Sequence, residues 1–228
     1  MNKTKMKMRK LVVLAVMVFA VSFVQAQDKT AKEYKIEGAD AYKAKEFQKG
    51  LDSFEKSIAM YEAEGKTDTS LYYNAGVCAY KVKSYDKAMV YFNKSLDLKY
   101  KSCNAMLYKA NALKKQKKYD EMEAVCNEGI SKCSRSQEKF NSILFKYYLK
   151  SGLSIYNNAA KMQSAANQYA STNQAKFDTE MVKVKNEFKR SLPMLEKAHE
   201  IDPDDANCKN ALKGAYEILD MSAKAMSL

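Results

Sequence analysis

The chain has 228 residues, of which 46% are hydrophobic, and it carries a formal net charge of +12 with only 7 glycines and 2 prolines. This apolar fraction is enough for a folded core and excludes a largely disordered chain. The few glycines and prolines argue against a β-sandwich or β-barrel, which needs many tight turns, and against a glycine-rich phosphate loop. Because alanine, lysine, methionine and leucine are abundant, the composition predicts an all-α fold.

Residues 1–26 have the regions of a secretory signal peptide. Five basic residues and no acidic residue lie within the first ten positions, and an apolar run from Leu11 to Val24 follows. Val24 and Ala26 provide small residues where a signal peptidase cleaves. The alternative is an uncleaved membrane anchor, but the run spans 14 residues, whereas a membrane-crossing helix needs about 20. We therefore expect export to the periplasm or the extracellular space, with a possible association with the cell envelope.

Removing residues 1–26 takes five positive charges from +12 and leaves a mature chain, beginning at Gln27, with a net charge of +7. A basic protein attracts anionic partners. For an exported protein, nucleic acid is not the expected partner. Acidic proteins, acidic peptides or anionic envelope polymers are better candidates.

A pattern of five positions occurs three times, with origins at Gly38, Gly76 and Ala110. Mostly aromatic residues follow each origin at +9 and +16, and mostly small residues follow at +12 and +19. Steps of three and four keep residues on one helix face, and small residues let two antiparallel helices approach closely. The positions after the three origins are Phe47, Gly50, Phe54 and Ser57; Tyr85, Ala88, Phe92 and Ser95; and Tyr119, Met122, Cys126 and Gly129.

The stretches 72–76 (Tyr-Tyr-Asn-Ala-Gly), 85–88 (Tyr-Asp-Lys-Ala) and 92–96 (Phe-Asn-Lys-Ser-Leu) resemble the tetratricopeptide repeat (TPR) family. The resemblance implies a right-handed superhelix of helix hairpins, an α-solenoid, in which the first helix of each hairpin lines a concave groove. It assigns three repeats to residues 27–136, the third of them degenerate. The three repeats span about 31–64, 69–102 and 103–136.

A fourth, longer hairpin is predicted over residues 137–203. Tyr148 and Gly152 repeat the aromatic and glycine spacing of the earlier units, and Phe188 opens the pattern of the second helix. Gly152 and Phe188 are 36 residues apart where the pattern has 9, so about 27 residues are inserted. Apolar stripes continue through the insertion. They predict two helices lengthened by about 13 residues, or about 20 Å, which project as a coiled-coil-like hairpin.

The polar stretch 171–173 is the expected break between these two helices. Pro193 is expected to kink the second of them, because proline removes a helical hydrogen bond. Residues 204–228 are predicted to form a capping helix, over about 205–222, followed by a tail.

The sequence offers little for catalysis. Its one histidine, His199, follows Glu196 by three residues, but a di-iron site with this spacing needs a second copy of the motif. Zinc-ligand spacings and the Gly-x-Ser-x-Gly turn of hydrolases are also absent from the sequence. We therefore expect a non-enzymatic protein without a cofactor or metal, in which His199 is a solvated helix residue.

The five cysteines leave at least one unpaired thiol in an oxidising compartment. Cys103 should begin the first helix of the third repeat, and Cys133 should follow its second helix. These two ends are adjacent in an antiparallel hairpin, so a disulfide between Cys103 and Cys133 is geometrically possible. Cys126 occupies a packing position and is expected to be buried.

The positions that line the groove in the resemblance are biased toward positive charge. Twenty such positions carry seven lysines, four tyrosines and no acidic residue, whereas the composition predicts about three acidic residues. Lysine offers a point charge and tyrosine a flat apolar surface with a hydroxyl, which together suit an extended segment carrying carboxylates. The alternative is a solvated face of a lysine-rich protein. The predicted partner-binding residues are Lys35, Tyr42, Lys43, Tyr73, Asn74, Tyr80, Lys81, Asn111 and Lys114.

These observations favour a scaffold that binds an acidic protein or peptide through its groove, its long hairpin, or both. A second hypothesis is an envelope structural factor that binds an anionic polymer or a membrane surface by charge. The identity of the partner and the oligomeric state stay open at this point.

Overall fold

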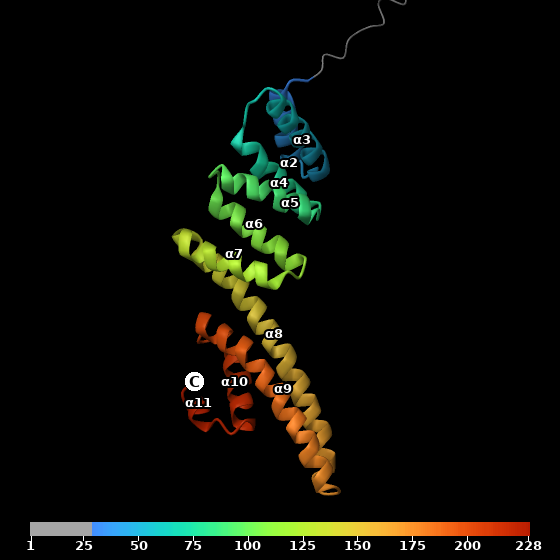
Figure 1. Ribbon diagram of the computed structural model, residues 1–228, viewed down its shortest axis with the longest axis vertical. Helices are drawn as coiled ribbons and strands as arrows, with labels where there is room; N and C mark the ends of the chain where they lie inside the picture. Colours follow the sequence, from blue (N-terminus) through green and yellow to red (C-terminus); the bar gives the residue numbers. More distant parts are fainter. Residues whose placement is uncertain (1–28) are drawn as a thin grey trace, which may run out of the picture.

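The computed structural model describes residues 29–228, so the predicted signal peptide lies outside the described residues (Figure 1). Every regular element in the described part of the chain is a helix, which confirms the predicted all-α fold. Six helices of 13 to 17 residues form three antiparallel hairpins. They are α2 (Ala31–Lys43), α3 (Phe47–Ala63), α4 (Thr69–Lys81), α5 (Tyr85–Asp97), α6 (Ser102–Lys115) and α7 (Tyr119–Lys132).

In each of the three hairpins, the same kind of turn joins the first helix to the second. Each first helix is followed by a lysine in the left-handed region, with φ of 62° at Lys45, 64° at Lys83 and 61° at Lys117. In the first turn, the amide of Glu46 donates to the carbonyl of Ala41 at 2.9 Å, and equivalent bonds close the other two turns. This is the hydrogen bond that ends a helix when the chain turns through a left-handed residue.

The repeated small and aromatic positions pack as the sequence predicts. Phe54 and Phe92, at offset +16, are at most 1% exposed. They lie against the glycines at the origins, where a Cβ would be closer than 3.0 Å to the aromatic ring. Ser57, at offset +19, is fully buried and donates its hydroxyl to the carbonyl of Ala31 at 2.6 Å. Buried side chains form one apolar cluster from α3 to α6 and a second from α6 onward.

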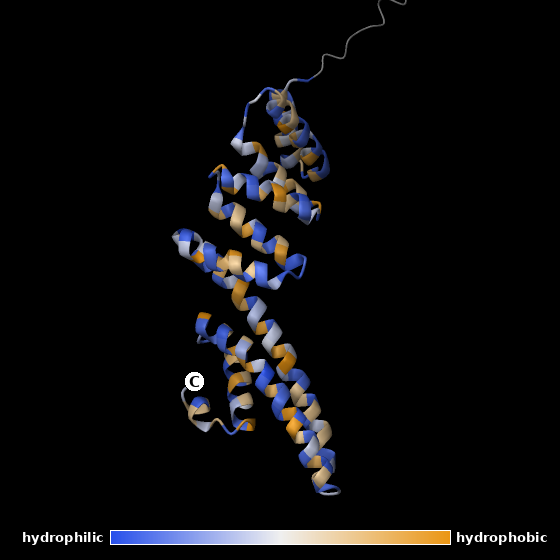
Figure 2. Cartoon of the chain, viewed as in Figure 1, coloured by the Kyte–Doolittle hydropathy of each residue, from blue (hydrophilic) through white to orange (hydrophobic). Residues whose placement is uncertain are grey.

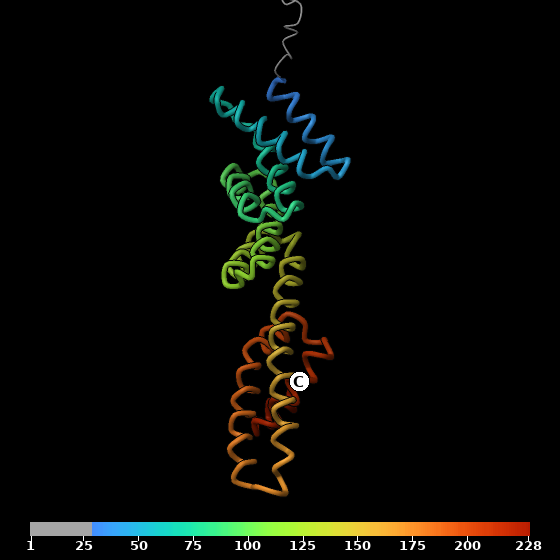
Figure 3. The backbone as a smooth tube through the Cα atoms, turned by 90° about the vertical axis from the view of Figure 1, so that its right-hand side faces the viewer, coloured from blue at the N-terminus to red at the C-terminus, as the bar shows by residue number. Residues whose placement is uncertain are grey.

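The fourth hairpin is much longer than the others and projects away from them (Figures 1 and 3). It consists of α8 (Gln137–Ala166), preceded by the short helix η1 (Ser134–Ser136), and α9 (Gln174–Ile201). After α8, the short helix η2 (Asn167–Tyr169) leads into a turn that includes the predicted break at 171–173. Helix α9 continues unbroken through Pro193, which is exposed. Apolar and polar residues alternate along both long helices, as Figure 2 shows.

The C-terminal cap differs from the sequence prediction. One helix was expected over about 205–222, but the structure has two: α10 (Ala206–Ile218) and α11 (Ser222–Met226). The chain turns at Asp220, which has φ of 58°, and the amide of Met221 donates to the carbonyl of Tyr216 at 2.8 Å. Helix α10 packs on α9 and also touches α8. Among residues 29–228, we found no helix that combines the length and the apolar character of a membrane span.

Candidate functional site

Three consecutive first helices bring four tyrosines together on one face. Tyr42 comes from α2, Tyr73 and Tyr80 from α4, and Tyr108 from α6. The ring centroids of Tyr80 and Tyr108 are 5.3 Å apart, and those of Tyr73 and Tyr108 are 6.3 Å apart. We call these four residues the tyrosine cluster. Because Tyr42, the α4 tyrosines and Tyr108 come from three different hairpins, the stacking of hairpins brings them together.

Further aromatic rings fix the cluster in place. Phe92 stacks on Tyr108 at a centroid distance of 5.4 Å with 12° between the ring planes. Tyr85 contacts Tyr80 at 5.7 Å, and Phe47 contacts Tyr42 at the same distance. Tyr42 is nevertheless 39% exposed, so the cluster has a solvent-facing edge. Contacts of this kind add to the free energy of burial and restrict ring motion.

The hydroxyl groups of Tyr73, Tyr80 and Tyr108 stay protonated at neutral pH. Burial, together with the nearby hydroxyls of Tyr108, Tyr42 and Tyr100, raises the pKa of Tyr73 to about 12. Burial also raises the pKa of Tyr80 and of Tyr108. A protonated phenol both donates and accepts hydrogen bonds. The cluster therefore offers apolar area and neutral polar groups, and no negative charge.

Positive charge lies next to the cluster. Nζ of Lys101 is 4.8 Å from the centroid of the Tyr73 ring, and Nζ of Lys81 is 5.8 Å from that of Phe47. Such cation–π contacts hold the ammonium groups over the aromatic rings.

Four lysines gather where α6 and α8 meet, and we call them the lysine cluster: Lys114, Lys115, Lys146 and Lys150. Burial lowers the pKa of Lys114, and the charges of Lys146, Lys115 and Lys150 lower it further. Both effects disfavour the charged ammonium group. The ammonium group of Lys114 therefore lies among like charges.

The structure gives the other predicted groove residues different roles. Lys35 forms an ion pair with Asp68, the N-cap of α4, so its charge is neutralised within the protein. Lys43 pairs with Asp40 at 3.0 Å on an exposed surface. Asn111 donates to the carbonyl of Leu107 at 2.8 Å, and Asn74 is half-buried on α4.

Tyr108 is the main residue that the sequence analysis missed. It lies two positions before the origin Ala110 and is not among the predicted partner-binding residues. The only available signal was that Tyr108 is aromatic and lies on the first helix of the third repeat. Its contacts with Tyr73 and Tyr80 depend on how closely α4 and α6 approach.

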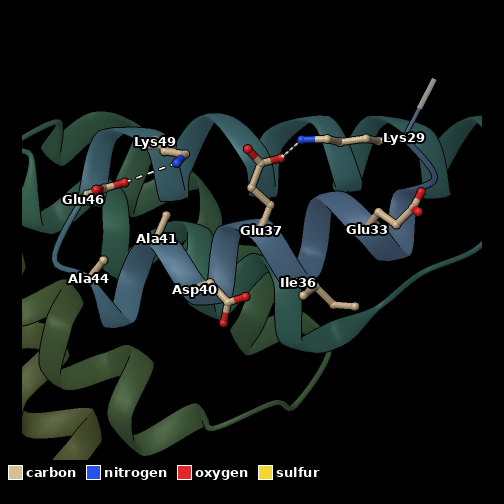
Figure 4. A pocket seen from close by; sticks show the side chains of 9 residues that line it. All are labelled: Lys29, Glu33, Ile36, Glu37, Asp40, Ala41, Ala44, Glu46 and Lys49. Atoms are coloured by element: carbon tan, nitrogen blue, oxygen red, sulfur yellow. Dashed lines mark hydrogen bonds and ion pairs between the residues drawn. The ribbon is translucent and has the colours of Figure 1, made fainter. Parts of the chain in front are cut away.

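A hollow of about 550 Å³ lies along α2 and the turn into α3 (Figure 4). Its rim is acidic, and Ile36, at 52% exposure, provides an apolar wall. Lys29 reaches Glu37 at 2.8 Å, and Lys49 reaches Glu46 at 3.4 Å. The remaining lining residues are Glu33, Asp40, Ala41 and Ala44. The net charge of the residues that line this hollow is negative, whereas that of the lysine cluster is positive.

The disulfide that the sequence suggested is present: Cys103 and Cys133 are joined, with their Cα atoms 5.7 Å apart. It ties the first turn of α6 to the residue that follows α7. The other three cysteines are buried thiols, as expected for Cys126. Burial raises the pKa of Cys126 to about 12 and that of Cys78 and Cys208 to about 11, so these thiols are poor nucleophiles at neutral pH.

His199 is half-buried, and its Nδ1 atom has no hydrogen-bond partner. The expectation of a solvated helix residue is therefore only partly right. Glu196, one turn earlier, accepts hydrogen bonds from Tyr216 at 2.8 Å and from Lys224 at 2.9 Å. Among residues 29–228, no group of three or more His, Cys, Asp or Glu side chains is placed to hold a metal ion.

No protein-family model and no curated protein sequence matches the chain. The fold is similar to solved structures. A TPR-repeat protein from Bacteroides fragilis matches with 22% identity and a TM-score of 0.45, over 84% of this chain and 98% of the other. A putative protein-binding protein from Bacteroides ovatus has 14% identity and a TM-score of 0.42, over 85% and 99%. YrrB, described as a TPR protein with an unusual peptide-binding site, has 15% identity and a TM-score of 0.44, over 82% and 94%. The sequence pattern and the consecutive helix hairpins make this chain similar to TPR proteins.

Proposed function

We propose that the chain is a non-enzymatic scaffold that binds a protein partner through the groove carrying the tyrosine and lysine clusters. The observation that carries the proposal is the tyrosine cluster, which combines a solvent-facing edge at Tyr42 with rings contributed by three hairpins. Aromatic side chains with a polar end are typical of binding surfaces, because they bury a large area and lose little rotamer entropy. An extended, acidic segment of the partner fits this surface and its lysines.

Rigidity supports this function. The rings of the cluster are packed against Phe92, Tyr85 and Phe47, which belong to the second helices of the first two hairpins. The disulfide between Cys103 and Cys133 holds the third hairpin closed. A surface whose side chains are already fixed loses little entropy when it binds a ligand.

The proposed place of action is outside the cytoplasm, in the periplasm or at the envelope. The signal-like sequence of residues 1–26 is the main support. A disulfide in the mature part of the chain also fits an oxidising compartment, where such bonds persist.

Site-specific photocrosslinking in cells tests the groove. A photoreactive residue at position 42, in the tyrosine cluster, should capture a discrete protein. The same residue at position 90 is the control, because Val90 is 65% exposed on α5 and takes no part in the cluster. Capture at position 42 should be lost when Tyr80→Ala is added and should be competed by an acidic peptide. Equal capture at both positions would contradict a groove-specific partner.

The second hypothesis, an anionic polymer or membrane surface as the ligand, makes a different prediction. Binding dominated by phosphate or carboxylate charges falls steeply with ionic strength. It should also tolerate Tyr42→Ala, because the tyrosine ring adds no charge. Binding that depends on Tyr42 and decreases only moderately between 50 and 200 mM salt favours the protein partner.

A further inference from the structure

The outer face of α8, in the long hairpin, carries almost no charge. Lys161 is the one charged residue in the stretch 151–175, whereas the 29% share of charged residues in the chain predicts about seven. The other exposed residues of α8 in this stretch are serines, asparagines and an alanine. A solvated helix face normally carries charged side chains, and the centre of a protein interface is depleted of them. The distribution of charge therefore points to a contact surface.

Four exposed residues of this face lie in one line along the helix. They follow one another at steps of four, three and four positions, which is the spacing of side chains that meet a second helix packed alongside. We call them the α8 seam: Ser154, Asn158, Lys161 and Ala165. Beside the seam lie Ile155 and Met162, which are half-buried and two helical turns apart. A neighbouring helix on the seam would cover both of these apolar side chains.

A hollow of about 510 Å³ adjoins the α8 seam. Its lining includes Ile155 and Lys161 of α8 and Glu187 of α9. Asn158 donates a hydrogen bond to Glu187 at 3.2 Å, and Arg190 donates to the other oxygen of the same carboxylate. The hollow therefore presents an apolar side chain, a cation and a carboxylate close together.

The end of the long hairpin is thinly packed. It extends past α10 and α11, so only two helices lie side by side there (Figures 1 and 3). Within residues 157–184 the fully buried side chains are Ala159, Ala166 and Val184, and the two alanines contribute little apolar area. Helices of this kind commonly form a closed core when four of them pack together. A second hairpin placed against the α8 seam would complete such a core.

Electrostatics favours a second copy of the chain as the occupant of this face. The net charge is +12 for the whole chain and +7 without residues 1–26, so two copies repel one another overall. A nearly uncharged face lets them meet at the lowest electrostatic cost. In an antiparallel pair with a two-fold axis near Asn158, Lys161 of each copy lies opposite Ile155 of the other and therefore near its Glu187. The symmetric arrangement thus adds two ion pairs between the copies.

We infer that a second copy of this chain docks on the α8 seam, and that the two long hairpins form an antiparallel four-helix bundle. The surface is separate from the groove formed by the first helices of the hairpins. The inference therefore does not depend on the proposed function. A dimer built in this way carries two grooves.

Analytical ultracentrifugation of the mature chain, with its disulfide intact, measures the Kd of the dimer. The variant Asn157→Lys/Ala165→Lys adds two positive charges to the outer face of α8 and should raise this Kd at least tenfold, because like charges then face each other across the interface. The matched control, Asn186→Lys/Ala175→Lys, makes the same two changes at exposed positions of α9 and should raise it less than twofold. Circular dichroism at 222 nm checks that both variants stay folded.

Two charge reversals test the arrangement of the copies. Lys161→Glu alone brings two carboxylates together at each predicted ion pair, and Glu187→Lys alone brings two ammonium groups together. Each variant should therefore dimerise at least tenfold more weakly than the wild type. An equimolar mixture restores both ion pairs and should form a heterodimer with a Kd within threefold of the wild-type value. A change that merely perturbs the fold of one copy is not rescued by mixing.

Three results would overturn the inference. The first is a wild-type chain that stays monomeric up to about 100 μM, which would leave the α8 seam to a different protein. The second is a dimer that the α8 variant and its α9 control weaken equally, because the contact would then lie elsewhere. The third is a mixture of the two charge reversals that dimerises no better than either variant alone, which would exclude the antiparallel pairing through Lys161 and Glu187.

Discussion

Gly38 and Phe54 are in such close contact that a side chain at position 38 has no room. A Cβ built on Gly38 would lie 2.7 Å from Cδ1 and 2.8 Å from Cε1 of the Phe54 ring. Phe54 is 1% exposed, so its ring is enclosed and cannot move aside without disturbing the core. Gly76 and Phe92 repeat this relationship in the second hairpin, where the closest ring atom is at 2.8 Å. In the first two hairpins, the distance between the paired helices is therefore set by a glycine facing an aromatic ring.

We expect Gly38→Ala to destabilise the protein by about 1–3 kcal/mol, the usual range for overpacking a core. This outcome is informative because alanine favours a helix over glycine by about 1 kcal/mol. Urea unfolding followed by circular dichroism measures the change. Gly214→Ala is the control, because the atom closest to its Cβ is the hydroxyl at the flexible end of Tyr156. A Gly38→Ala variant as stable as Gly214→Ala would show that the contact does not fix the helix spacing.

At the left-handed turn residues, we expect a substitution by glycine to stabilise the protein. Lys83 has φ of 64°, a conformation that costs a residue with a Cβ about 1 kcal/mol or more relative to glycine. Lys83→Gly should therefore stabilise the protein by about 0.5–1 kcal/mol and raise Tm. Lys87→Gly, in the first turn of α5, should instead destabilise it, because that position is helical and its side chain pairs with Glu55 at 2.8 Å. Equal effects of the two substitutions would contradict the turn geometry.

Loss of the disulfide should lower stability considerably. Cys103 and Cys133 are 30 positions apart, and closing a loop of this length stabilises a protein by about 3–4 kcal/mol in the chain-entropy description. The Cys103→Ser/Cys133→Ser variant should lose this amount in urea unfolding. Treating the wild type with a dithiol reductant should reproduce the loss and leave the variant unchanged. A reductant effect of equal size on both proteins would contradict the assignment.

The ion pair between Lys35 and Asp68 predicts a dependence of stability on pH. Burial of the Asp68 carboxyl opposes ionisation, but hydrogen bonds from Lys35 and Ser70 outweigh it and lower the pKa below its usual value. Because the folded-state pKa is the lower one, the stabilisation is complete at neutral pH and is lost as the pH falls below about 4. Asp68→Asn should cost about 1–2 kcal/mol at pH 7.

The cost of Asp68→Asn should shrink as the pH falls below about 4, because the wild-type carboxyl then becomes protonated. Urea unfolding at several pH values measures this trend. Asp97→Asn is the control, because Asp97 is exposed at the end of α5 and has no ion-pair partner among the described residues. A cost of Asp68→Asn that stays constant from pH 7 to pH 3 would rule out this role of the ionised carboxyl.

The helices and hairpins could be predicted because their signals are local. The residues from Gly38 to Ser57 show a helix period with small and aromatic positions, and the structure has α2 and α3 there. The inserted length between Gly152 and Phe188 likewise predicted the long α8 and α9. The split between α10 and α11 was missed, because Asp220 carries no glycine or proline signal for its left-handed turn.

The groove was less predictable because its properties depend on contacts between hairpins. The lysine at position 35 fits the groove pattern, yet Asp68, 33 positions later, neutralises it. Tyr108 joins the tyrosine cluster only because α4 and α6 lie side by side at a particular distance. Lys114 was predicted as a groove residue, but its closeness to Lys146 and Lys150 on α8 follows from packing.

The covalent bond between Cys103 and Cys133 also determines how the chain responds to mechanical tension along its backbone. A pulling force applied at the two ends passes through the sulfur bridge, so the enclosed α6–α7 segment carries no load. Fully stretched, the 30 peptide units between the two cysteines would span about 100 Å. The disulfide keeps the two Cα atoms 5.7 Å apart, so this segment cannot extend under force. Under tension the third hairpin would thus stay intact while the neighbouring hairpins unfold.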